Sequence, residues 1–164
     1  MRQSVEFCSE RDLPELFALF ANWYRFNPRM QERDYFSWQF KNAPHRLGKG
    51  DYDFLVLRGP DGALQGGLGI VGFEVCEQGR IERAGWTHNW HGGPGGHGGF
   101  ALHSRFAELV DRHFLLRINA QVQRIFALLD IPILPALPRY WAAADAARVC
   151  ELFAISGDDR KVVA

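Results

Sequence analysis

The sequence has few cysteines, no net charge and no long apolar run, and each absence excludes a class of protein. Its three cysteines, Cys8, Cys76 and Cys150, are far apart and form no CxxC pair. We therefore expect reduced, buried thiols in a cytoplasmic protein rather than a disulfide scaffold. The 19 basic and 19 acidic residues cancel, so no long-range field favours nucleic acid. No apolar stretch approaches the roughly 20 residues that span a bilayer, and the N-terminus lacks the apolar core of a signal peptide.

The amino-acid composition is sufficient to form one packed domain. Hydrophobic residues make up 47% of the 164 residues and charged residues 23%, which is typical of an ordered globular chain. We expect a single domain over residues 1–142, followed by a C-terminal tail or linker over residues 143–164 that is rich in alanine and then polar.

The spacing of apolar residues predicts the order of elements. Short turns at 59–62 and 77–79 join three strands into an antiparallel meander, and a strand–helix–strand unit after residue 80 favours a parallel pair. Four glycines in the second meander strand weaken it, which indicates a bulge or the close approach of a bulky group. The predicted strands are 4–8, 54–58, 63–73, 80–90 and 114–118, with an extended stretch at 137–142. The predicted helices are 13–25, 32–41, 100–113 and 120–129.

Six glycines lie between the strand 80–90 and the helix that begins near Phe100: Gly92, Gly93, Gly95, Gly96, Gly98 and Gly99. A glycine loop that enters a helix directs several N–H groups to one point, where the helix dipole also favours negative charge. The loop therefore suits a phosphate or pyrophosphate. A plain surface loop is the alternative.

Other ligands compete for this loop. Residues 93–98 match the dinucleotide pattern GxGxxG, but that motif should follow the first strand of a parallel fold. No GK(S/T) follows, so the loop is not a Walker P-loop. We expect no metal, because the spacing of the histidines fits no compact site and no cysteine joins them. These histidines are His88, His91, His97, His103 and His113.

The order of elements and the glycine loop resemble the GNAT superfamily of acyl-CoA-dependent N-acyltransferases. In that superfamily two helices precede an antiparallel meander, and a loop of pattern Arg/Gln-x-x-Gly-x-Gly/Ala enters a helix. Residues 93–98 align with this loop, with Gly96 and Gly98 at the small positions, and Asn119 stands where a later helix often opens with Asn. The resemblance spans residues 5–141. It implies an α/β fold in which the meander joins a shorter parallel pair, with helices on both faces.

The resemblance implies acetyl-CoA or another acyl-CoA as co-substrate and a primary amine as acceptor, with no nucleic acid or membrane as partner. Residues 38–44 and 137–141 resemble a subgroup of polysaccharide and amino-sugar pathways, which implies an amino sugar as acceptor. The sequence leaves the acyl chain length open, and also whether the protein is a homodimer. The residues assigned to acyl-CoA are Asn89, Trp90, Gly93, Gly95, Gly96, His97, Gly98, Gly99 and Asn119.

The candidate bases lie on the strand 80–90, where residues of even number share one face. Glu82 and His88 are the candidates, and His88 is preferred because an ordinary imidazole, with a pKa of about 6.5, accepts a proton near neutral pH. Trp86 and Trp90 share their face. Aromatic residues of the second helix, Tyr35, Trp38 and Phe40, together with Trp86, are the predicted acceptor-binding residues.

Two positions depart from the family pattern. Gly93 replaces the first Arg or Gln of the loop, and Phe126 falls where a general-acid Tyr usually stands. Either the thiolate leaves without a protein acid, or the domain is a degenerate module that binds acyl-CoA or serves in assembly. A nucleotide-dependent oxidoreductase is the second alternative.

Overall fold

The computed structural model describes residues 3–25, 27–96, 98–115 and 120–128. The chain divides into two units, residues 1–118 and 119–164. The described part of the second unit is one helix, α4 (Ala120–Leu128). The first unit contains the strands of the described residues, in the order β1 (Ser4–Phe7), β2 (Phe54–Arg58), β3 (Leu64–Glu77), β4 (Arg80–His91) and β5 (Arg112–Phe114). Its helices are α1 (Leu13–Trp23), α2 (Arg33–Phe40) and α3 (Gly99–Ala107), with short 3-10 turns η1 (Glu10–Asp12), η2 (Pro28–Gln31) and η3 (Pro94–Gly96).

The five strands form one sheet in the order in which they occur in the chain. β1 to β4 are antiparallel neighbours, and β5 pairs with β4 in parallel. This confirms the predicted meander with a shorter parallel pair. The connection from β4 to β5 runs through α3, as a parallel pair requires.

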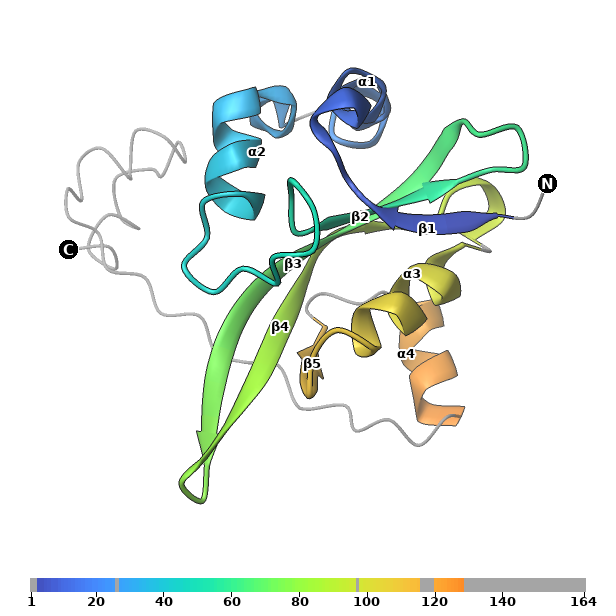
Figure 1. The fold of residues 1–164 in the computed structure, drawn as a ribbon. Coiled ribbons are helices and arrows are strands. Elements are labelled where there is room, and N and C mark those ends of the chain that lie inside the picture. Colours follow the sequence, from blue (N-terminus) through green and yellow to red (C-terminus); the bar gives the residue numbers. More distant parts are fainter. Residues whose placement is uncertain (1–2, 26, 97, 116–119, 129–164) are drawn as a thin grey trace, which may run out of the picture. The chain divides into compact units, whose positions relative to one another are not determined.

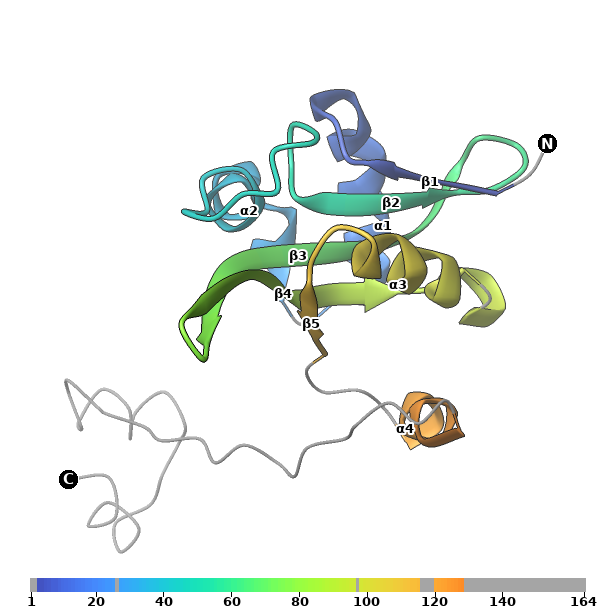
Figure 2. The ribbon, with the colours of Figure 1, turned by 60° about the horizontal axis from the view of Figure 1, so that its bottom comes forward.

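Helices cover both faces of the sheet, with α1 and α2 on one and α3 on the other (Figure 1, Figure 2). Strand β2 shows why. Its residues Phe54 and Val56 belong to the core under α1 and α2, whereas Leu55 and Leu57 belong to the core under α3. A strand buried on both faces has an unbroken apolar run, and all four of these residues are fully buried.

The glycines of β3 admit aromatic rings. A Cβ atom on Gly69 would lie 2.5 Å from the ring of Phe40, and one on Gly67 would lie 2.5 Å from the ring of Phe54. Real Cβ contacts are never this short, so both positions require glycine. The expected close approach of a bulky group is confirmed.

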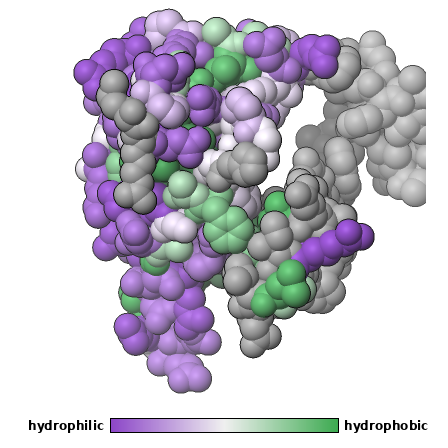
Figure 3. All heavy atoms as spheres, turned by 90° about the vertical axis from the view of Figure 1, so that its right-hand side faces the viewer, coloured by the Kyte–Doolittle hydropathy of each residue, from purple (hydrophilic) through white to green (hydrophobic). Residues whose placement is uncertain are grey.

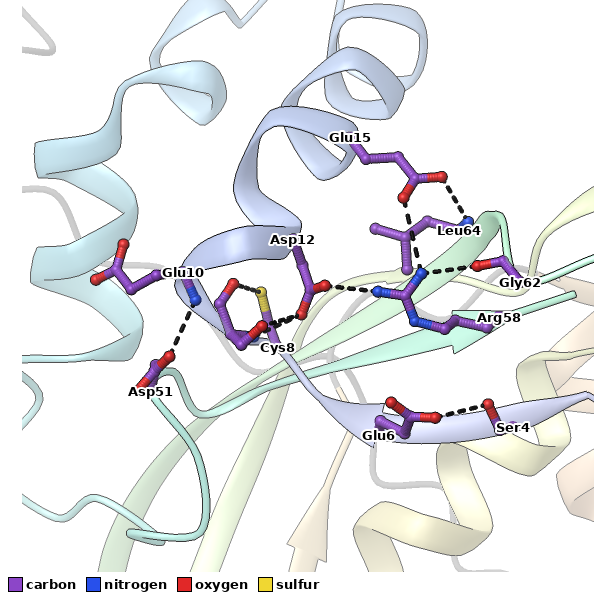
Figure 4. A network of polar contacts seen from close by, with 11 residues as sticks. Ser4, Glu6, Cys8, Glu10, Asp12, Glu15, Asp51, Arg58, Gly62 and Leu64 are labelled. Atoms are coloured by element: carbon purple, nitrogen blue, oxygen red, sulfur yellow. Dashed lines mark hydrogen bonds and ion pairs between the residues drawn. The ribbon is translucent and has the colours of Figure 1, made fainter.

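A polar network fastens the start of α1 to the β2–β3 turn (Figure 4). Asp12 accepts hydrogen bonds of 2.7 Å from the backbone N–H and the hydroxyl of Ser9, and its other oxygen lies 2.5 Å from Arg58. Arg58 also donates to the carbonyl of Gly62 at 2.7 Å. The side chains of Asp12 and Arg58 are only 6% and 21% exposed, so solvent screens this pair weakly.

We expect Arg58→Met to lower the free energy of unfolding by about 3 kcal/mol, because it leaves the Asp12 carboxylate buried without its cation. Urea denaturation measures this loss. The control is Arg105→Met, which removes an exposed pair with Glu108 on α3 and should cost less than about 0.5 kcal/mol. Equal losses in the two variants would contradict the prediction.

Three sequence-based expectations are wrong in detail. Helix α3 ends at Ala107 rather than near His113, and β5 begins at Arg112 and ends at Phe114. The reason is tertiary: the amide of Asp111 donates to the carbonyl of Arg83 at 2.9 Å, so the chain turns early to pair beside β4. Cys8 is buried as expected, but Cys76 is exposed. It lies near the projecting end of the β3–β4 hairpin, which mostly hydrophilic side chains cover (Figure 3).

Among the helices in the described part of the chain, none is long and apolar enough to cross a membrane.

Candidate functional site

Strand β4 contains a bulge immediately before the glycine loop. Gly69 pairs with His88 and Gly67 pairs with His91, so two steps along β3 oppose three along β4. The extra residue lies at Asn89, whose φ of 50° is rare for a residue other than glycine. A bulge of this kind redirects the side chains that follow it and often lies next to a functional site.

The bulge reverses the alternation of side chains. His88 lies on the α2 face, where its Nδ1 is 3.2 Å from the amide nitrogen of Gln39. Trp90 lies on the opposite face and stacks on His103 of α3, with ring centroids 5.7 Å apart. The expectation that Trp90 shares the face of Glu82, Trp86 and His88 is therefore wrong, because one inserted residue changes the parity of every later position.

The recorded pairing between β4 and β5 ends just before the bulge. Their pairing covers Ala84 to Trp86 on β4 and Arg112 to Phe114 on β5. β4 then continues to His91, and none of these later residues pairs with the described residues of β5.

The glycine loop has the geometry of an anion site. Gly93, Gly95 and Gly96 have φ values of 74°, 69° and 73°, a region that side chains other than glycine rarely adopt. The loop closes with a hydrogen bond of 3.0 Å from the Gly98 amide to the Gly92 carbonyl. α3 then begins at Gly99, so the N–H groups of its first turn have no intrahelical acceptor. Those N–H groups, together with the positive end of the helix dipole, suit a pyrophosphate.

Three histidines, on β4, α3 and β5, have pKa values below the ordinary value for histidine. Burial lowers the pKa of His91, which follows the bulge, and that of His103, on α3, where the neighbouring His113 adds to the effect. Burial likewise lowers the pKa of His113. Residues 92–99 include no Lys or Arg, so the loop itself offers an anion backbone N–H groups and no cationic side chain.

The two candidate bases have different surroundings. His88 is exposed and lies beside Gln39 of α2. The Glu82 side chain is 11% exposed and is bound by Arg112, whose Nε lies 2.6 Å from a carboxylate oxygen. Arg112 also pairs with Glu77 at 2.5 Å. The carboxylate of Glu82 is therefore neutralised in an ion pair, whereas the imidazole of His88 has a neutral neighbour.

The predicted acceptor residues do not form one surface. Trp38 is 65% exposed and its ring lies 5.7 Å from that of Tyr35. Trp86 packs against Phe73 and Phe114, with ring centroids 5.2 and 5.1 Å away. Phe40 differs, because it is fully buried against Gly69 and therefore packs in the core instead of facing an acceptor.

Some predictions fall outside the described residues, namely those for His97, Asn119, Cys150 and the stretch 137–142. Phe126 is on α4, in the second unit. Within residues 3–25, 27–96, 98–115 and 120–128, no three His, Cys, Asp or Glu side chains gather closely enough to bind a metal ion.

Three features were not found from the sequence: the bulge at Asn89, the Gln39–His88 contact and a stack between His91 and Trp23. The stack joins residues 68 positions apart in the chain, and no local pattern predicts such contacts. The only signal for the bulge was Asn89 in the run THNWH at residues 87–91, because Asn tolerates a positive φ better than most residues.

Solved structures share this architecture. An aminoglycoside acetyltransferase from an uncultured soil metagenomic sample matches with a TM-score of 0.55 and 16% identity, over 88% of this chain and 100% of that one. A ribosomal-protein-alanine N-acetyltransferase from Brucella melitensis matches with a TM-score of 0.53 and 15% identity, over 87% and 99%. An integron cassette protein from V. cholerae matches with a TM-score of 0.58 and 11% identity, over 95% and 99%.

The sequence itself matches no family model and no curated protein. At these identities the structural matches show the fold, which is that of the GNAT-type acetyltransferases.

Proposed function

We propose that this protein is an acyl-CoA-dependent N-acyltransferase that moves an acetyl or other acyl group to a primary amine. One observation carries the proposal. The bulge at Asn89 follows the residues of β4 that pair with β5, and three residues later the chain enters the glycine loop that leads into α3. Backbone of β4 and an anion site at the loop would together suit a ligand with both a carbonyl and a pyrophosphate.

Backbone N–H groups of the loop, of α3 and of β4 would bind the acyl donor. The N–H groups at the start of α3 and in the loop would hold the pyrophosphate of acyl-CoA. Backbone N–H groups of β4 beyond Trp86 would polarise the thioester carbonyl and stabilise the oxyanion of the tetrahedral intermediate. Gly93 supports this assignment, since a site built from backbone donors does not depend on the Arg or Gln that the family pattern has there.

The amine acceptor would bind on the face of the sheet that α2 covers. An ammonium acceptor must lose a proton before its nitrogen attacks the thioester. His88 lies on this face and can remove that proton directly or through water, while Glu82 is held by Arg112. The amine then attacks the carbonyl carbon, the carbon–sulfur bond breaks, and CoA leaves as the thiolate or takes a proton from solvent, because Phe126 has none to donate.

An amino sugar is the proposed class of acceptor. Its support is the resemblance of residues 38–44 to a subgroup of amino-sugar pathways and the exposed aromatic pair of Trp38 and Tyr35 on α2. Aromatic rings supply large, rigid contact surfaces for such ligands. Steady-state acyl transfer from acetyl-CoA to a panel of amino sugars, other primary amines and peptides tests both the reaction and the class of acceptor.

We expect Trp38→Ala to raise the KM for the acceptor by about tenfold, since its exposed ring would contribute about 1.4 kcal/mol of contact. The KM for acetyl-CoA should change little. The variant should fold normally, because the Trp38 ring is mostly exposed. Unchanged acceptor kinetics would show that the ring does not contact the acceptor.

A degenerate module that binds acyl-CoA without transferring it is the second candidate, and Phe126 is the residue that favours it. Binding of CoA with no turnover of any amine would support it. The nucleotide-dependent oxidoreductase loses support, because the GxGxxG loop follows the fourth strand of an antiparallel meander and not the first strand of a parallel fold. Calorimetric binding of NAD(H) would restore it.

A further inference from the structure

We propose that His91 and Trp23 are positioning residues that hold the glycine loop in the conformation that binds pyrophosphate. This inference rests on the proposed function, since it assigns a role in CoA binding to His91, which contacts the loop, and to Trp23, which contacts His91. Glycines restrict the backbone little, so a loop with six of them needs a tertiary contact to keep one conformation.

His91 contacts the loop through a specific atom. Its Nδ1 lies 3.3 Å from the backbone nitrogen of Gly93 and accepts that N–H. Gly93 is the first loop residue with a positive φ, at 74°. The hydrogen bond therefore acts where the chain leaves the extended conformation of β4 and begins the loop.

Trp23 fixes the imidazole from the other side. The rings of Trp23 and His91 are stacked, with centroids 3.9 Å apart and planes inclined by 10°. Trp23 is the last residue of α1, which packs through Leu16 and Phe20 in the core of the sheet. The stack thus connects a rigid helix to the start of the loop.

The glycine at position 66 of β3 allows the backbone of residues 91–93 to approach closely. A Cβ atom on Gly66 would lie 2.5 Å from the carbonyl oxygen of His91 and 3.1 Å from the nitrogen of Gly93. A Cβ atom on Gly93 would lie 2.9 Å from the carbonyl oxygen of Gln65. Residues 91–93 are therefore confined between β3 and α1, and one imidazole connects them to the helix.

The hydrogen bond defines the state of the ring. Since Nδ1 accepts, it carries no proton, and the neutral imidazole carries its proton on Nε2. Burial lowers the pKa of His91 and so keeps the ring in this neutral form at pH 7. The hydrogen bond to His91 uses the N–H group of Gly93 and no other N–H group of the loop.

Two substitutions separate the two contacts. His91→Phe keeps a ring to stack on Trp23 and removes the acceptor, whereas His91→Asn keeps a short acceptor and removes the stack. We expect each to raise the Kd of CoA by about fivefold, the effect of one lost hydrogen bond or ring contact. Trp23→Ala should do the same. In acyl transfer, KM for acetyl-CoA should rise while kcat changes little.

The test is calorimetric titration of CoA into the wild-type protein, the three variants and a control, His45→Phe, which changes an exposed histidine outside the loop. Thermal melting verifies that each variant is folded. ¹⁵N NMR of the wild-type imidazole should show an unprotonated Nδ1 at His91. If wild-type protein binds CoA and folded His91 and Trp23 variants bind it equally well, the inference is overturned. If wild-type protein binds no CoA, the proposed function itself fails.

Discussion

Replacing Gly96 with valine is expected to weaken CoA binding by about tenfold or more, the largest effect we foresee for a change in the loop. A Cβ atom on Gly96 would have no atom within 4 Å, so the new side chain would project into open space at the mouth of the loop. There it would obstruct the approach of a pyrophosphate to the N–H groups. Calorimetric titration of CoA measures the change.

Backbone strain requires its own control, because valine disfavours the φ of 73° at Gly96. Gly48 is a close match: its φ is 72°, and a Cβ atom there would also have no atom within 4 Å. Both valine variants should lose about 1–2 kcal/mol of stability, but only Gly96→Val should lose CoA affinity. If both variants bind CoA as the wild type does, the loop does not hold the cofactor.

Gly98 is unsuited to this experiment, although the sequence pattern marks it equally. A Cβ atom on Gly98 would overlap the side chain of Leu57 and lie 3.0 Å from the carbonyl oxygen of Gly92. Leu57 is fully buried in the core under α3. Gly98→Val would therefore damage the fold, and its loss of CoA binding would not report on the loop.

Replacing His88 with alanine is expected to lower kcat/KM by about 10²-fold or more, because the variant lacks the base that deprotonates the acceptor ammonium. In the wild type kcat/KM should rise with pH as the imidazole loses its proton, and His88→Ala should lack this limb. A full pH profile of both enzymes with saturating acetyl-CoA measures the effect.

Gln39 and Glu82 provide the matched comparisons. Glu82→Gln should have a small effect, since the Glu82 carboxylate is bound by Arg112. Gln39 can present either atom of its amide to His88 Nδ1. With the amide oxygen there, the proton resides on Nδ1, and Nε2 is the nitrogen that can accept a proton as the base. Gln39→Leu should therefore lower kcat less than His88→Ala does. Near-full activity of His88→Ala with an unchanged pH profile would exclude His88 as the base.

The sequence predicted the elements whose signals are local. The apolar run Phe54–Leu57, the turn at 59–62 and the amphipathic face of α1 gave the meander and its first helix nearly residue by residue. Predictions from the sequence were wrong where a contact with a residue far away in the chain determines where an element ends. Helix α3 stops at Ala107 because the chain beyond it pairs with β4, and a helical period within residues 100–113 carries no information about that partner.

The candidate site divides in the same way. The sequence by itself determined the glycine loop, because positive φ values and a helix start depend on residue types at adjacent positions. Only the tertiary structure decided which side chains surround that loop. Because of the bulge at Asn89, Trp90 lies on the face of α3 and His91 stacks on Trp23. Phe40 is buried in the core. These outcomes depend on contacts between residues far apart in the chain, whose energies arise only when the sheet and helices pack together.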